Sequence, residues 1–331
     1  MLNEKELIKE IIDSKKEITD VYFAACGGSM NDLYPGHYFI EKESTKLHST
    51  WKPARELTMI NSPHWNEHSI TFALSHSGNT PEVIEAAKLA KKKGSFVIAI
   101  TNDPNSDITD PALSDELYVY DWGKETSHKD VPMGMDYRIL NEFLHQTEES
   151  YQKYDQMIAG LNKIDQIVDN ARKVQRPAAQ KFAQKYRKQD FMYILGSGAN
   201  MSQAYGFAIC SLMEMQWMDC AFIDSAEFFH GPFEVLQDDH LFIQCVNTGD
   251  TRALDTRSRD FIKKYHGQLE VIDSKDFGME EIDNSVVDYF NPIVFYEMGV
   301  LYRDELGEKR AHDTDFRQYM GKVDYSYKPS I

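Results

Sequence analysis

Short apolar runs alternate along this chain with amphipathic stretches in which apolar residues recur at helical spacing. Each run has the length of a strand, and strands that alternate with helices indicate a parallel sheet with helices on both faces. We therefore predict an α/β fold. The strands expected from this pattern are 21–25, 70–74, 95–101 and 117–122 in the first half, and 191–195, 221–223, 240–246 and 268–272 in the second half.

The two halves of the pattern look like copies of one unit. In each half an apolar strand leads through a glycine-containing turn into a helix, and a polar helical stretch from about 136 to 187 separates the halves. Such self-similarity indicates an ancient duplication, so we predict two parallel-sheet subdomains, each a three-layer α/β/α arrangement. The expected boundaries are 1–150 for the first subdomain, 151–187 for the helical connection and 188–331 for the second subdomain with its C-terminal tail.

The hexapeptide Ser75–Thr80 lies between the apolar run 70–74 and an amphipathic stretch that starts at Pro81. It is predicted to be a strand-to-helix turn in which Thr80 is the N-cap and Pro81 the first helical residue. A helix N-terminus has unpaired N–H groups and partial positive charge, and here the Ser75, Ser77 and Thr80 hydroxyls lie beside it. This combination predicts an anion site that suits phosphate. The alternative is a plain capped turn in which Gly78 supplies only flexibility.

A second turn of this kind follows the first predicted strand. It has the sequence Cys26-Gly27-Gly28-Ser29, and ligands of parallel sheets bind at the carboxyl ends of strands, where both turns are expected. A third turn, Gly196-Ser197-Gly198, does not fit a dinucleotide motif, because Met201 stands where the third glycine is needed. The lysine of a phosphate-binding P-loop is missing as well.

Composition narrows the class of partner. The net charge of −17 argues against nucleic-acid binding and against an anionic membrane surface. No apolar run is long enough to span a bilayer, and the stretch 1–16 is an amphipathic helix and no signal peptide. The four cysteines show no CxxC pairing and stand in apolar contexts, so we expect buried thiols and a cytoplasmic protein.

Candidate acid/base residues lie in the second half. Glu214 stands between Met213 and Met215 in an apolar helical stretch, and a carboxylate in such a setting suits proton transfer near neutral pH. His230 precedes Gly-Pro, which predicts the end of a short helix and an available imidazole. Both residues have a plainer interpretation, since Glu214 can face solvent and a lone histidine is more often structural. A metal site is not expected, because His64 and His68 lie in a predicted loop without further ligands.

These motifs together resemble the sugar isomerase (SIS) family. The likeness is to the double-SIS isomerase part of glucosamine-6-phosphate synthase and to its fructosamine-6-phosphate deglycase relatives, and it covers nearly the whole chain. Cys26–Ser29 looks like the family's CGxS turn, Ser75–Thr80 like its SxSGxT phosphate loop, and Glu227–Pro232 like its ExxHGP segment.

The resemblance implies two flavodoxin-like SIS subdomains and a role for individual residues. It implies a homodimer with shared active sites, in which the histidine reaches the site of the neighbouring subunit, and it implies no cofactor. The implied phosphate-binding residues are Ser29, Ser75, Ser77 and Thr80, the weaker substrate contacts are Gly28, Gly78 and Glu227, and the catalytic residues are Glu214, His230 and Lys322.

Departures from the family pattern bear on the reaction. The synthases begin with a cysteine nucleophile and a glutaminase domain, whereas this chain starts Met1-Leu2-Asn3 and enters the first SIS unit within about 20 residues, so amide transfer is not expected. A lysine that the synthases carry three residues before the catalytic glutamate is Ser211 here. Phe228-Phe229 before His230 looks closest to the deglycases.

The expected function is therefore cleavage of a 6-phosphorylated fructosyl amino acid to a hexose 6-phosphate and a free amino acid, without a metal or redox cofactor. An aldose–ketose isomerase or an amino-sugar-phosphate deaminase remains a rival, because both use the same kind of proton shuttle. A non-catalytic sugar-phosphate sensor is a third possibility. Acidic charge and the lack of a basic helix-turn-helix region count against a DNA-binding sensor.

Overall fold

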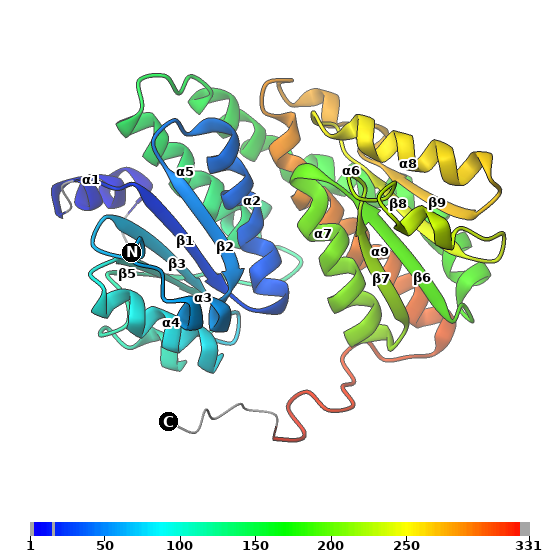
Figure 1. Ribbon diagram of the computed structural model, residues 1–331, viewed down its shortest axis with the longest axis horizontal. Helices are drawn as coiled ribbons and strands as arrows, with labels where there is room; N and C mark the ends of the chain where they lie inside the picture. Colours follow the sequence, from blue (N-terminus) through cyan, green and yellow to red (C-terminus); the bar gives the residue numbers. More distant parts are fainter. Residues whose placement is uncertain (1–2, 15–16, 325–331) are drawn as a thin grey trace.

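The computed structural model describes residues 3–14 and 17–324 and contains two parallel sheets flanked by helices (Figure 1). The first half of the chain forms a five-stranded sheet of order β2-β1-β3-β4-β5, and the second half a four-stranded sheet of order β7-β6-β8-β9. The predicted α/β class and duplicated architecture are confirmed. The first-half elements are α1 (Glu4–Ser14), β1 (Asp20–Ala25), α2 (Gly27–Glu43), β2 (His48–Pro53), α3 (Ala54–Ile60), β3 (Ser69–Leu74), α4 (Pro81–Lys92), β4 (Phe96–Thr101), η1 (Asp107–Thr109), β5 (Glu116–Val119), η2 (His128–Asp130) and α5 (Pro132–Thr147).

The second half repeats this order of strands and helices after the long helix α6. Its core strands consist almost entirely of apolar residues, as expected of parallel strands covered on both faces. The elements are α6 (Tyr154–Tyr186), β6 (Phe191–Gly196), η3 (Gly198–Asn200), α7 (Met201–Gly206), η4 (Phe207–Glu214), β7 (Asp219–Asp224), η5 (Pro232–Val235), β8 (Leu241–Val246), α8 (Arg252–Lys264), β9 (Gln268–Asp273), η6 (Ser274–Phe277), η7 (Met279–Glu281), η8 (Val287–Phe290) and α9 (Asn291–Arg310).

Strand order locates the ligand-binding edge of each sheet. In the first sheet β1 lies between β2 and β3, so the connections leave β1 in opposite directions. Parallel sheets bind ligands at such a point, at the carboxyl ends of the two strands, here β1 and β3. The register pairs Ala24 with Ala73. The turns that follow these strands therefore lie side by side. In the second sheet β6 and β8 hold the equivalent positions.

One large core joins the two halves. Its buried apolar side chains come from both sheets and from α5, α6 and α9, and α9 packs along α6. At the junction α2 of the first half faces α7 of the second (Figure 1). The approach is close, because a Cβ on Gly206 would lie 2.6 Å from Asn31 Nδ2.

Several boundaries differ from the sequence prediction. The predicted strand 117–122 is β5 (Glu116–Val119), and β2 was not foreseen because its residues are half-exposed and mostly polar. The apolar stretch 201–217 is not one regular helix, since it changes from α-helix in α7 to a π-helix in η4. The N-terminal helix is confirmed as α1, although residues 1, 2, 15 and 16 lie outside the described residues. None of the described helices is both long and apolar enough to cross a bilayer.

His128 connects η2 to two helices through its two ring nitrogens. Nδ1 lies 2.7 Å from Asp165 Oδ1 on α6, and Nε2 lies 3.5 Å from Glu297 Oε1 on α9. Burial alone disfavours the imidazolium, but the hydrogen bonds to Glu297 and Asp165 outweigh it, so the pKa of His128 is raised above 6.5. His128 thus connects the end of the first half to the helices that support the second.

This contact predicts a pH dependence of stability. A raised histidine pKa gives stabilisation that is fully present below about pH 6.5 and is lost as pH rises through the folded-state value. The urea midpoint should therefore fall between pH 6 and pH 8.5, and the fall should be smaller in His128→Gln. Equal slopes in the two proteins would show that His128 does not contribute.

Candidate active site

The Ser75–Thr80 turn connects β3 to α4 and is built around a pair of hydroxyls. Ser75 is buried, and its Oγ lies 2.9 Å from Thr80 Oγ1. Thr80 is the N-cap residue, as predicted, but its hydroxyl contacts Ser75 and does not cap α4. The two hydroxyls close the base of the turn.

Any side chain at position 78 of this turn would collide with a neighbouring residue. Its φ is +67°, and a Cβ would lie 1.7 Å from Ser106 Oγ. The segment after β4 therefore packs directly against the turn, and this packing fixes the direction of its backbone. The role of Gly78 is thus to allow close approach as well as the left-handed conformation.

The turn has free hydrogen-bond donors. In the described part of the chain the N–H groups of His76 and Ser77 donate to no acceptor, and Ser77 is exposed. Both residues lie ahead of the N-terminus of the 12-residue helix α4, where the partial charge is positive. Unpaired N–H groups, exposed hydroxyl and helix N-terminus are the features of an anion site.

The second predicted turn lies beside the first. Gly27 has φ +58°, and Gly28 and Ser29 form the first turn of α2. Gly28 is exposed and Ser29 half-buried. Because β1 and β3 are adjacent and in register, this turn and Ser75–Thr80 share one edge of the first sheet.

Glu214 reaches this edge from the second half of the chain. A Cβ on Gly28 would lie 3.9 Å from Cys210 Sγ, and Glu214 follows Cys210 by one turn of the π-helix. Such wide helical turns occur often at functional sites, because they redirect a side chain. The structure therefore brings Glu214 toward the Gly28 turn.

The expectation of an apolar setting for Glu214 is wrong. The side chain is 26% exposed and forms an ion pair with Arg317, whose Nε lies 2.8 Å from Glu214 Oε1. Sequence reasoning missed Arg317, and no local pattern marks it because its partner is 103 residues away along the chain. The ion pair with Arg317 fixes the position of the Glu214 carboxylate.

The cysteines are all free, and two of them are not buried as expected. Cys220 and Cys245 are buried, whereas Cys26 and Cys210 are half-buried near the first-sheet turns. Burial, together with the charges of Glu214 and Asp32, raises the pKa of Cys210 to about 12. Cys210 is therefore a neutral thiol and no nucleophile.

His230 lies away from Glu214 of the same chain. It occupies an exposed turn after β7, and not the end of a helix as predicted, with Glu227 exposed beside it. Glu214 precedes β7 and His230 follows it, so the two residues are connected through opposite ends of a six-residue strand that is about 17 Å long. One chain alone does not bring them together.

Lys322 belongs to an exposed segment that follows α9. Its Nζ lies 3.7 Å from the centre of the Phe316 ring, and Phe316 contacts Trp217. Lys322 contacts none of the predicted phosphate-binding residues. The segment is nevertheless attached to the site, because Arg317 pairs with Glu214.

A cluster of aromatic side chains that the sequence did not predict lies next to the Ser75–Thr80 turn. His76 Nδ1 lies 2.7 Å from the Tyr120 hydroxyl, and Trp122 contacts both His76 and Tyr296 of α9. These residues carry no motif, since a tyrosine and a tryptophan at the end of a strand are ordinary core residues in sequence. The described residues contain no cluster of three or more side chains suited to hold a metal ion.

The second half has a loop that corresponds to the Ser75–Thr80 turn, but the N–H groups of its Thr248 and Gly249 already have acceptors. The loop Asn247–Thr251 joins β8 to α8, as Ser75–Thr80 joins β3 to α4, and the Asn247 Nδ2 to Thr251 Oγ1 contact of 2.8 Å corresponds to the Ser75–Thr80 pair. The Gly249 N–H donates to Asn247 Oδ1 at 2.7 Å. The Thr248 N–H donates to Asn291 Oδ1 at 3.1 Å.

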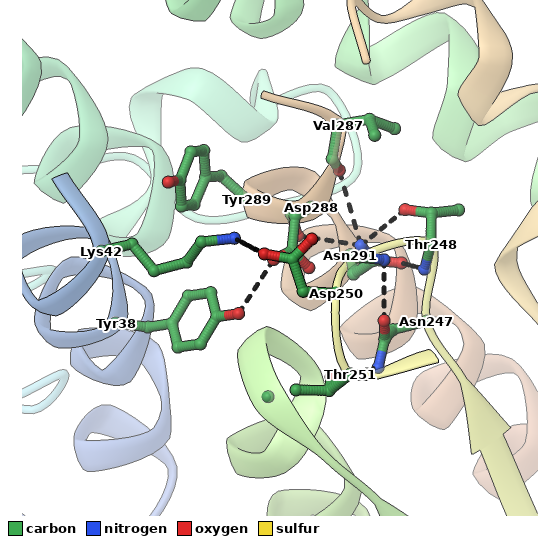
Figure 2. Close-up of polar contacts among 12 residues, drawn as sticks. Tyr38, Lys42, Asn247, Thr248, Asp250, Thr251, Val287, Asp288, Tyr289 and Asn291 are labelled. Carbon is green, nitrogen blue, oxygen red and sulfur yellow. Dashed lines mark hydrogen bonds and ion pairs between the residues drawn. The ribbon is translucent and has the colours of Figure 1, made fainter. Parts of the chain in front are cut away.

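A carboxylate of the chain itself covers this second loop (Figure 2). A Cβ on Gly249 would lie 1.9 Å from Asp288 Oδ1. Asp288 Oδ2 accepts hydrogen bonds from Tyr38 at 2.9 Å and from Lys42 at 3.0 Å, both on α2. The second loop thus connects the two halves and offers no open anion site.

Removal of the Lys42 ammonium group, which pairs with Asp288, is expected to destabilise the fold. In Lys42→Met the Asp288 carboxylate, whose side chain is 9% exposed, loses its cation, and the free energy of unfolding should fall by about 2 kcal/mol. Urea denaturation measures the change. Lys46→Met, an exposed lysine just after the same helix, should stay within about 0.5 kcal/mol of the parent. Equal effects of the two variants would contradict the assignment.

Known proteins are similar to this chain in sequence and in fold. Residues 19–115 match the SIS domain family. The fructosamine deglycase FrlB of Bacillus subtilis (strain 168) is 38% identical over 312 residues, which is 94% of each chain. The fructoselysine 6-phosphate deglycase of Escherichia coli (strain K12) is 21% identical over 321 residues, covering 95% of this chain and 88% of that protein.

A solved structure agrees along almost the whole chain. The crystal structure of a candidate phosphosugar isomerase from Bacillus subtilis superposes with a TM-score of 0.92 at 36% identity and covers 98% of both chains. The two parallel sheets and the sequence identity to these relatives place the chain in one family. The chain belongs to the SIS family of sugar-phosphate deglycases and isomerases.

Proposed function

We propose that this protein is a fructosamine-6-phosphate deglycase, which cleaves a 6-phosphorylated fructosyl amino acid into a hexose 6-phosphate and a free amino acid. The observation that carries the proposal is the contact of η4, the helix that ends at Glu214, with the Gly28 turn, which lies beside the Ser75–Thr80 turn of the other half of the chain. The identity to FrlB over 94% of both chains supports the same reaction.

The proposed phosphate site consists of Ser29, Ser75, Ser77 and Thr80. The phosphate accepts hydrogen bonds from the free N–H groups of His76 and Ser77, and the α4 N-terminus stabilises its charge. With the phosphate fixed, the other end of the open-chain sugar extends from the first sheet. Positioning of this kind accelerates proton transfer because it removes the entropy cost of alignment.

The proposed chemistry is a proton shuttle followed by hydrolysis. Glu214 removes a proton from C1 of the ketoamine to give an enaminol, and proton delivery to C2 gives a C1 imine. Water then adds to the imine, the C1–N bond breaks, and the aldehyde and the amine leave. Each well-placed acid or base in such a scheme contributes about 10²–10⁴-fold.

We further propose that the active enzyme is a homodimer in the cytoplasm. Glu214 and His230 of one chain are connected through opposite ends of β7, which suits a site completed by His230 of a second subunit. In this arrangement His230 assists ring opening or the leaving nitrogen, and Lys322 polarises the C2 oxygen. Four free cysteines fit a reducing compartment.

The test is a coupled assay for glucose 6-phosphate and released amine. Purified protein is given 6-phosphofructosyl-lysine, 6-phosphofructosyl-aspartate and 6-phosphofructosyl-glycine in turn, and turnover of one of them is expected. Ammonia from glucosamine 6-phosphate would instead indicate a deaminase, and interconversion of hexose phosphates an isomerase. Binding without any product would indicate a sensor.

A further inference from the structure

Asp32 is a half-buried carboxylate on α2. It follows Gly28 by four residues on α2, so the two share one face of the helix, and that face meets Cys210 of η4. The Cys210 thiol experiences the negative charges of both Glu214 and Asp32. Two carboxylates, one from each half of the chain, therefore flank the same thiol.

The surroundings of Asp32 contain several polar groups but no partner for its charge. Its charge acts on Tyr120, Tyr296 and the buried Asp136. Tyr120 is in turn hydrogen-bonded to His76 of the phosphate turn. Among the described residues no salt bridge or hydrogen bond to the Asp32 side chain is found. A half-buried carboxylate without a protein cation is costly unless it takes up a proton or a ligand supplies the positive charge.

The proposed substrate carries such a charge. A fructosamine has a secondary amine on C1, which is protonated at neutral pH, and this nitrogen becomes the leaving group. We propose that Asp32 binds the C1 nitrogen of the substrate and carries the proton that this nitrogen needs on leaving. The proposal rests on the proposed deglycase function and names the group that recognises the amine.

The proton transfers balance without another reactant. Water added to the imine gives a carbinolamine with a hydroxyl and an amine on C1. The Asp32 carboxylic acid gives its proton to the nitrogen as the C1–N bond breaks. A lone pair of the C1 hydroxyl oxygen forms the second carbon–oxygen bond of the aldehyde. The O–H bond leaves its electron pair on that oxygen as the hydroxyl proton passes to the Asp32 carboxylate. Burial raises the pKa of Asp32 to about 7, so both forms are present at neutral pH.

Two unreactive ligands that differ only at C1 test the proposal. They are 1-amino-1-deoxysorbitol 6-phosphate and sorbitol 6-phosphate, and isothermal titration gives their affinities without turnover. The parent protein should prefer the amine by about tenfold, the effect of one charge-assisted hydrogen bond. Asp32→Asn should lose this preference and keep its affinity for sorbitol 6-phosphate within about twofold. An unchanged preference in the variant would overturn the proposal.

A second measurement needs no variant. If Asp32 binds the amine, the preference of the parent for the amine ligand should weaken between pH 8 and pH 6, as the carboxylate takes up its proton. A preference that stays constant over this range would contradict the assignment. Because neither measurement needs catalysis, a failure of the deglycase assay with an intact amine preference would reject the proposed function and retain the role of Asp32.

Discussion

Glu214→Gln is expected to lower kcat for a 6-phosphofructosyl amino acid by about 10³-fold. The amide keeps the size of the side chain but cannot accept the C1 proton, and the ion pair with Arg317 is replaced by a neutral contact. The phosphate turn belongs to other elements, so affinity for sorbitol 6-phosphate should change little. Steady-state kinetics with the glucose 6-phosphate assay, together with titration of that ligand, measures both quantities.

The matched control for Glu214→Gln is Glu308→Gln, which makes the same change at an exposed position on α9. It should retain full activity. If Glu214→Gln retained more than about a tenth of the parent kcat, another group would have to remove the C1 proton.

Mixing two inactive variants is expected to restore activity. Glu214→Gln and His230→Ala should each be inactive, because each variant lacks one of the two proposed acid/base groups. In the proposed homodimer the Glu214 and His230 that form one site come from different chains. In a dimer of one chain of each kind, one site receives both intact residues. Random exchange between equal amounts should therefore recover about a quarter of the parent activity.

This recovery is measured after unfolding and refolding the two variants together, with each refolded alone for comparison. The control is Glu214→Gln refolded with the double variant Glu214→Gln/His230→Ala, which cannot form an intact site. No recovery in the first mixture would show that the two residues do not act at a shared site.

The features that could be predicted from the sequence are those formed by residues close together along the chain. The Ser75–Thr80 turn was predictable because its glycine, its hydroxyls and Pro81 all act within a few residues of one another. The strands were predictable for the same reason, since a buried parallel strand is a continuous apolar run. Thr80 shows the limit of this reasoning, because its hydroxyl contacts Ser75 when helix capping was expected.

The remaining features depend on contacts distant in sequence. Glu214 stands among methionines in sequence, yet its carboxylate pairs with Arg317, and no neighbouring residue indicates this. The loop Asn247–Thr251 lacks the two serines of the Ser75–Thr80 turn, so strand order, and not motif, identifies it as the second copy.

The Asp288 carboxylate occupies the place over the Asn247–Thr251 loop that an anionic ligand would need, and it is attached to the same chain. A group attached to the same chain faces its site at an effective concentration of about a millimolar or more, and it cannot diffuse away. A free sugar phosphate would have to displace it while also meeting its negative charge. Although the duplicated fold has two such loops, each chain should therefore saturate as a single site, and any cooperativity in substrate binding would require the proposed homodimer.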